Sequence, residues 1–113
     1  MEMEMTQVAD DVVNVALVGR LDTPGVGRIE TRFTAALVPH GARAVVDLSR
    51  VDFVSSMGLR MFIAVGRALA KNHGKLVLYV PQPPVNEVFE TVSLSDIIPV
   101  KPDSASALAV ARS

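Results

Sequence analysis

Short runs rich in β-branched residues alternate with amphipathic helical patterns along this chain. A valine-rich run at Val12–Val18 precedes Val26–Val38, where apolar residues recur at helical spacing. Such alternation is typical of α/β layers, in which right-handed crossovers carry helices over a mostly parallel sheet. A further strand-like run, Met3–Val8, is separated from Val12–Val18 by a turn at Asp10 and Asp11. The sheet is therefore expected to open with an antiparallel pair.

The rest of the chain continues the alternation. Ala44–Leu48 is a short apolar run, as expected of a central strand buried on both faces, and Met57–Asn72 reads as a second helix. The pattern predicts a mixed sheet of about five strands packed by about four helices, in a single domain over residues 1–113. The later elements expected are a strand at Leu76–Val80, a stiff loop at Pro81–Pro84, a helix at Val85–Val92, an edge strand at Ile97–Val100 and a helix at Ser104–Ala111.

The start of the first helix carries clear boundary signals. Thr23 is placed to cap it, and Pro24 is suited to its first turn. The segment Gly25–Gly27 has a fragment of a phosphate-loop pattern, but it lacks both the third glycine and the Lys-Ser/Thr ending. These glycines are therefore interpreted as marking the entry to a helix.

Composition excludes several classes of function. A formal net charge of -1 over 113 residues argues against a nucleic-acid binder, which needs a dense basic face. The chain has no cysteine, so it has no disulfide framework and no catalytic thiol. Its acidic opening differs from a secretory signal, and its apolar runs are shorter than the roughly 20 residues that cross a bilayer. We expect a cytoplasmic protein with no direct membrane insertion.

The candidates for catalysis and metal binding are weak. His40 and His73 each precede a glycine, and neither has a second ligand at metal-binding spacing. Ser55 and Ser56 are outside any nucleophile-elbow pattern, and no histidine lies nearby in the sequence to activate them. The sequence predicts no enzyme activity, no metal site and no cofactor.

The most informative stretch is Asp47–Arg60, which joins a strand to a helix through Ser55 and Ser56. A serine at a helix start can simply cap it, a contribution of about 1 kcal/mol. The amides and the positive dipole end at that position can also accommodate a phosphate, so a hydroxyl there can be modified without breaking the fold. Both interpretations remain open.

These residues bear a family resemblance. The motif Asp-Leu-Ser-x-Val-x-Phe-x-x-Ser-x-Gly-Leu, which begins at Asp47, resembles that of STAS domains of the anti-sigma factor antagonist type. Gly19–Asp22 is similar to the family's Gly-x-Leu-Asp turn, Gly74–Leu78 to a later strand, and Pro84–Leu94 to a later helix. The resemblance spans nearly the whole chain.

The resemblance implies a phosphorylation site at Ser56. In the family, the serine two residues before Gly-Leu is phosphorylated by an anti-sigma factor that acts as a serine kinase. Ser55 stands where the family usually has Asp, and Met57 stands where it has Ser or Thr. The expected partners are an anti-sigma factor with serine kinase activity and a serine phosphatase, and the chain itself is expected to be a monomer or weak dimer.

The partner surface is expected around the starts of the two helices. Along the second helix, Met57, Met61, Ala64 and Ala68 follow helical spacing, which suits either a flexible contact stripe or the core. The residues predicted to bind the partner are Asp22, Thr23, Ser55, Ser56, Met57, Gly58, Leu59, Arg60 and Met61.

A second hypothesis is a STAS scaffold that does not switch, either in a signalling assembly or as an accessory subunit of a transporter. The residues at Ser55 and Met57 favour it, whereas the retained Ser56 favours the switch. The size of the particle in solution discriminates the two.

Overall fold

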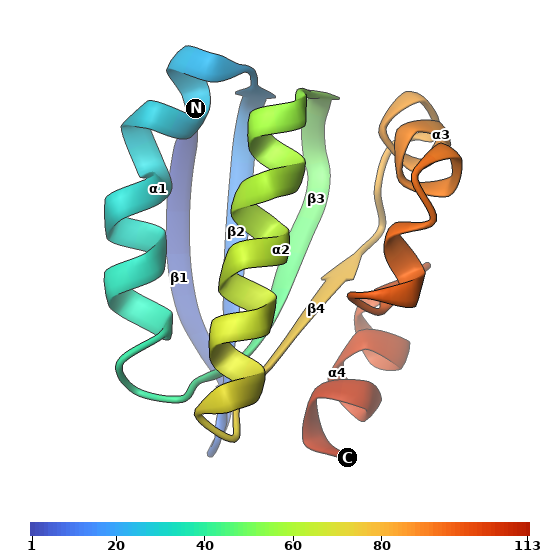
Figure 1. Ribbon diagram of the computed structural model, residues 1–113. Coiled ribbons are helices and arrows are strands. Elements are labelled where there is room, and N and C mark those ends of the chain that lie inside the picture. Colours follow the sequence, from blue (N-terminus) through green and yellow to red (C-terminus); the bar gives the residue numbers. More distant parts are fainter.

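The computed structural model describes all residues, 1–113, as one five-stranded sheet with helices on both faces (Figure 1). The strands lie in the order β1-β2-β3-β4-β5, which is also their order in the chain. The elements are β1 (Glu2–Ala9), β2 (Val12–Leu21), α1 (Thr23–Leu37), β3 (Arg43–Val54), α2 (Ser56–Lys71), β4 (Lys75–Tyr79), α3 (Pro83–Thr91), a 3-10 turn (Leu94–Asp96), β5 (Val100–Lys101) and α4 (Ser104–Arg112).

The sheet is mixed, as the pattern predicts. β1 and β2 pair antiparallel around the turn between Ala9 and Val12, and the pairs β2–β3, β3–β4 and β4–β5 are parallel. The predicted α/β class, the opening antiparallel pair and the strand and helix content are all confirmed.

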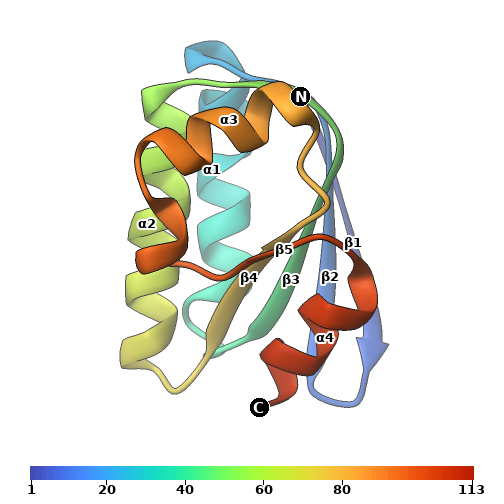
Figure 2. The ribbon, with the colours of Figure 1, turned by 90° about the vertical axis from the view of Figure 1, so that its right-hand side faces the viewer.

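The helices divide unequally between the two faces of the sheet. Figure 2 shows α1, α2 and α3 on one side and α4 alone on the other. The larger core lies under the first three helices, where the rings of Phe33 and Phe62 meet edge to face with centroids 6.2 Å apart. The smaller core lies under α4, where Ala107 and Ala111 pack on Val45 and Val77. β3 is thus buried on both faces in its first half, as expected of a central strand.

α4 is held by polar contacts at both of its ends. At its start the Asp103 carboxylate accepts a hydrogen bond from the Ser106 amide at 2.8 Å, and this bond lowers the pKa of Asp103. At its end Arg43 Nη1 donates to the Ala111 carbonyl at 2.7 Å, and Lys75 Nζ donates to that of Val110 at 3.3 Å. A carboxylate at the start of a helix and cations at its end both complement the helix dipole.

Several strand boundaries differ from the prediction, and β2 continues past the predicted end at Val18 to Leu21. β3 continues past Leu48 to Val54, because Val51 and Val54 still point into the core while the residues between them are exposed. The edge strand predicted at Ile97–Val100 is instead Val100–Lys101, since Leu94–Asp96 forms a 3-10 turn. Leu94 and Ile98 are buried there without belonging to a strand.

Helix starts also shift. Pro83 and Pro84, predicted as loop, form the first turn of α3, where a missing backbone N–H costs nothing.

No helix of the chain is both long and apolar enough to span a membrane.

Candidate functional site: the starts of α1 and α2

Two helices begin side by side at the carboxyl ends of β2 and β3. Leu21 and Val54, the last residues of these strands, are paired in register. A single residue then links each strand to its helix: Asp22 leads into α1 and Ser55 into α2. The parallel pairing therefore brings both helix starts to the same edge of the sheet.

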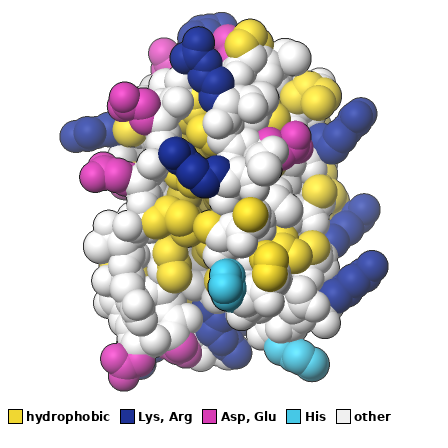
Figure 3. All heavy atoms as spheres, turned by 90° about the vertical axis from the view of Figure 1, so that its left-hand side faces the viewer, with side chains coloured by type: hydrophobic (Ala, Val, Ile, Leu, Met, Phe, Trp, Pro, Cys, Tyr) yellow, Lys and Arg dark blue, Asp and Glu magenta, His cyan; other side chains and the backbone are white.

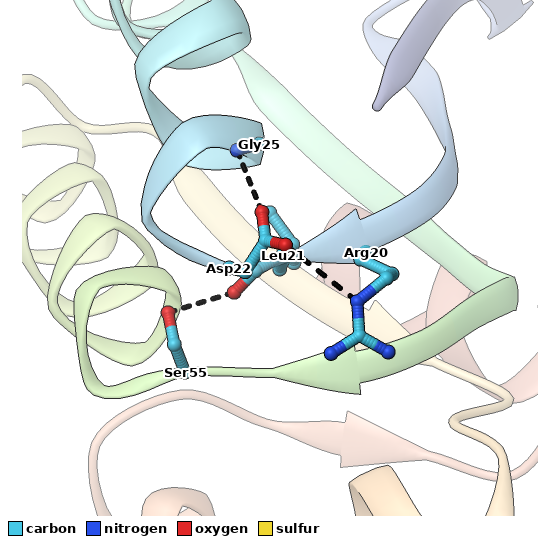
Figure 4. A network of polar contacts seen from close by, with 5 residues as sticks. All are labelled: Arg20, Leu21, Asp22, Gly25 and Ser55. Atoms are coloured by element: carbon cyan, nitrogen blue, oxygen red, sulfur yellow. Dashed lines mark hydrogen bonds and ion pairs between the residues drawn. The ribbon is translucent and has the colours of Figure 1, made fainter.

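Ser55 is the N-cap of α2 and ties it to β2 (Figure 4). Its Oγ accepts a hydrogen bond from the Gly58 amide at 3.3 Å and donates one to the Leu21 carbonyl at 2.7 Å. The backbone amide of Ser55 donates to the same carbonyl at 2.8 Å. Ser55 is therefore a structural residue whose hydroxyl is already engaged on both sides.

Asp22, and not Thr23 as predicted, caps α1. Its Oδ1 accepts a hydrogen bond from the Gly25 amide at 2.8 Å, and Arg20 Nε lies 3.5 Å from its Oδ2. The backbone of Asp22 is extended, the conformation that an N-cap needs, whereas Thr23 is the first residue of the helix. Gly25 is buried, and a Cβ at this position would meet the Arg20 carbonyl oxygen at 2.1 Å. This close approach explains why the helix entry carries a glycine.

Ser56 is the first residue of α2, and it is exposed. Because Ser55 makes the capping bonds, the Ser56 side chain is not needed to start the helix. The two adjacent serines thus have different surroundings, one half-buried and one facing solvent.

The remaining predicted contact residues separate into surface and core. Arg60 is exposed, and Met57 and Leu59 are half-buried. Gly58 and Met61, also predicted to bind the partner, are buried, so the exposed surface at these helix starts does not include them. Met61 belongs to the larger core, and a Cβ on Gly58 would lie 3.0 Å from Val54 Cγ2.

The proposed methionine and alanine stripe is not a single surface. Met61 is buried, Ala64 is exposed, and Met57 and Ala68 are half-buried. What lies at this edge of the sheet is therefore a patch made of Asp22, Thr23, Ser55, Ser56, Met57, Leu59 and Arg60, which we call the helix-start patch.

Sequence reasoning missed an arginine and an aromatic residue beside this patch. Phe53 is 38% exposed, and the guanidinium carbon of Arg20 lies 4.4 Å from the centroid of its ring. Arg20 also pairs with the Asp22 carboxylate, so one side chain joins the end of β3 to the cap of α1. Arg20 and Phe53 are partners across β2 and β3, a relation that becomes visible only when the register of the two strands is known.

The chain presents no metal centre: no three residues among histidine, cysteine, aspartate and glutamate lie close enough together to hold an ion. His40 and His73 are both exposed, and His73 lies in the turn that ends α2 with φ 65°. The site consists of hydroxyls, one carboxylate, arginines and an exposed ring, a set suited to protein contact.

Comparisons with known proteins agree with this geometry. The model of the STAS domain family matches residues 4–107. The putative anti-sigma factor antagonist BtrV of Bordetella bronchiseptica is 33% identical over 100 residues, which cover 88% of this chain and 85% of BtrV. The chain therefore belongs to the STAS domain family. Within that family it groups with the anti-sigma factor antagonists, which are regulatory proteins and not enzymes.

Solved structures share the fold. An anti-sigma factor antagonist from Mycobacterium paratuberculosis superimposes with a TM-score of 0.86 at 24% identity, covering 99% of this chain and 94% of that one. The Bacillus cell fate determinant SpoIIAA, in its phosphorylated form, superimposes with a TM-score of 0.70 at 22% identity, covering 96% and 97% of the two chains.

Proposed function

We propose that the chain binds an anti-sigma factor that is also a serine kinase, and that phosphorylation of Ser56 ends this binding. The observation that carries the proposal is the exposure of Ser56 at the first position of α2, next to a serine that already caps the helix. A kinase can reach this hydroxyl without opening the fold.

The chemistry of the helix start supports a charge switch at this position. A phosphoserine carries a charge of about -1.5 to -2 at neutral pH, and the positive end of the α2 dipole stabilises such a group. The same charge in a protein interface opposes association unless the partner supplies a cation. Phosphorylation of Ser56 is therefore expected to leave the domain folded and to weaken partner binding.

Ser55 replaces the family's usual Asp without loss of the cap. A carboxylate at this position could accept the Gly58 amide, but it could not donate to the Leu21 carbonyl as the Ser55 hydroxyl does. The replacement also removes a negative charge beside the acceptor hydroxyl, which reduces repulsion of an incoming phosphate. Ser55 thus alters the electrostatics of the site more than its architecture.

Phosphopeptide mapping tests the proposal. The protein is isolated from its native cells under several growth conditions, and a strain carrying Ser56→Ala controls for site assignment. Phosphate on Ser56 that varies with growth condition is the expected result. Its absence in every condition, with Ser55 also unmodified, would instead favour the scaffold that does not switch.

Partner binding is tested with two variants of Ser56, one with a neutral side chain and one with a negative charge. Ser56→Ala is expected to keep partner affinity, and Ser56→Asp is expected to lower it. The anti-sigma factor that co-purifies with the unmodified chain serves as the probe, measured by calorimetry. Equal affinity for the wild type and both variants would argue against a charge-switched interface.

A further inference from the structure

The helices that follow β4 and β5 leave the sheet toward opposite faces. α3, which follows β4, contributes Val85 and Phe89 to the larger core, whereas α4, which follows β5, contributes Ala107 and Ala111 to the smaller one (Figure 2). β4 and β5 are parallel neighbours, so the two connections diverge from adjacent strand ends. In α/β sheets a divergence of this kind opens a crevice at the carboxyl ends of the strands, and ligands bind there.

The chain has such a crevice, with a volume of about 420 Å³. Its apolar lining comes from Val80, Phe89 and Val100, and its polar lining includes Asn86, Glu90 and Lys101. α3 and β5 both line it, as does Val80 in the link between β4 and α3. Ligand sites in proteins commonly have this size and this mixture of apolar surface with a few polar groups.

Val80 is held in a strained backbone conformation at this crevice. Its φ is 48°, in the left-handed region that a β-branched residue rarely adopts. The Val80 amide donates a hydrogen bond to the Lys101 carbonyl at 2.9 Å, so β5 helps to fix the strained residue. Strained residues of this kind concentrate at ligand sites, where the surrounding structure keeps them in place.

The two walls of the crevice carry opposite charges. On α3, Glu90 Oε1 accepts a hydrogen bond from Asn86 Nδ2 at 3.0 Å, which leaves the second carboxylate oxygen and the amide oxygen as acceptors. On β5, Lys101 takes part in no ion pair, since the one ion pair of the chain joins Arg20 and Asp22. Acceptor groups from α3 and a cationic residue from β5 thus line the same crevice, together with the apolar Val80 and Val100.

We propose that this crevice binds a small zwitterion, namely a free α-amino acid with an apolar side chain. Its carboxylate pairs with Lys101, its ammonium group lies against Glu90 and Asn86, and its side chain packs on Val80 and Val100, which are both half-buried. This site is separate from Ser56 and stands independently of the proposed switch.

The test is an NMR titration of the full chain with L-leucine. Amide shifts are expected in α3 and β5, but not at the start of α2. Leucinol, which lacks the carboxylate, and 4-methylpentanoate, which lacks the ammonium group, should each bind at least about tenfold more weakly, because each loses one charge-assisted contact.

Two single variants measure the contribution of each wall of the crevice to binding. Lys101→Gln is expected to weaken L-leucine binding about tenfold, and Glu90→Gln to weaken it similarly, while Lys71→Gln on the exposed face of α2 serves as the matched control and should leave it unchanged. Unchanged unfolding midpoints would show that the variants fold. The proposal is overturned if L-leucine causes no shifts up to about 10 mM, if the shifts lie elsewhere, or if both variants bind as tightly as the wild type.

Discussion

Two adjacent serines at the start of α2 have separable roles, and their alanine variants should show it. Ser55→Ala removes the cap of α2 and the bond to the Leu21 carbonyl, so it should lower the free energy of unfolding by about 1–2 kcal/mol. Ser56→Ala removes an exposed hydroxyl and should change it by less than about 0.5 kcal/mol. Urea denaturation of both variants measures the difference, and a larger loss for Ser56→Ala would contradict this assignment of the cap.

A second residue-scale prediction concerns Tyr79, the one tyrosine of the chain. Burial raises its pKa, and the nearby Asp47 carboxylate raises it further. Its hydroxyl donates to Asn14 Oδ1 under α4. Because the folded state holds the neutral phenol, this contribution to stability is complete below the unfolded pKa of about 10 and is lost as pH rises through the folded value.

Absorbance of the tyrosinate band during alkaline titration measures that pKa. Asp47→Asn should bring it partly back toward the ordinary value, since desolvation remains, and Asp52→Asn, at an exposed position of the same strand, is the control. An identical titration curve for the wild type and Asp47→Asn would show that the carboxylate does not act on Tyr79.

At the scale of elements, two helical glycines should respond to alanine in opposite directions. A Cβ on Gly27 meets nothing within 4 Å, so Gly27→Ala should stabilise α1 by about 0.5–1 kcal/mol through the entropy of the unfolded chain. A Cβ on Gly58 would lie 3.0 Å from Val54 Cγ2 and 3.3 Å from the Leu21 carbonyl oxygen, so Gly58→Ala should cost about 1–3 kcal/mol. Thermal unfolding of both variants measures these changes in stability. Stabilisation by Gly58→Ala would contradict the prediction and would mean that α2 can move away from β2.

α4 should loosen on its own in acid. The pKa of Asp103 is lowered mainly by its hydrogen bond to the Ser106 amide, so its capping contribution is present above the ordinary carboxyl pKa and is lost as pH falls through the folded value. Amide hydrogen exchange across this pH range should show α4 losing protection first, with Asp103→Ala showing the same loss at neutral pH. Equal protection of α4 in the wild type and in Asp103→Ala would show that the Asp103 cap does not stabilise this helix.

The element order was predictable, but several boundaries were not. Alternation of strand and helix patterns is a local property, and it gave the strands, the helices and the opening antiparallel pair. The second half of β3 is buried on one face only, where Val51 and Val54 point into the larger core, so its exposed polar residues masked the strand in the sequence pattern. The candidate site was also predictable only in part, because the motif located Ser55 and Ser56. The burial of Met61 and the contact between Arg20 and Phe53 follow from packing between elements far apart in the sequence.

For the whole molecule, the sheet places its two candidate sites along one edge. The helix-start patch lies at the carboxyl ends of β2 and β3. The crevice between α3 and β5, proposed to bind a free amino acid, lies at the carboxyl ends of β4 and β5. Gln82, the residue before α3, donates a hydrogen bond to the Ser49 carbonyl of β3 at 2.9 Å and so links the two regions. A ligand in the crevice that shifted α3 would therefore have a direct contact through which to reach β3.

The outer strand β1 should determine whether the chain is monomeric in solution. It is an edge strand of eight residues, which could pair with another copy, but Glu2 and Glu4 are exposed on it and Arg32 of α1 donates to the Met3 carbonyl. Figure 3 shows this face of the molecule, with charged groups of both signs around its exposed hydrophobic atoms. Sedimentation velocity should therefore show a 12.1 kDa monomer or a weak dimer, and replacing both glutamates with valine should promote association. A large particle formed by the wild-type chain would contradict this, and it would favour the scaffold over the switch.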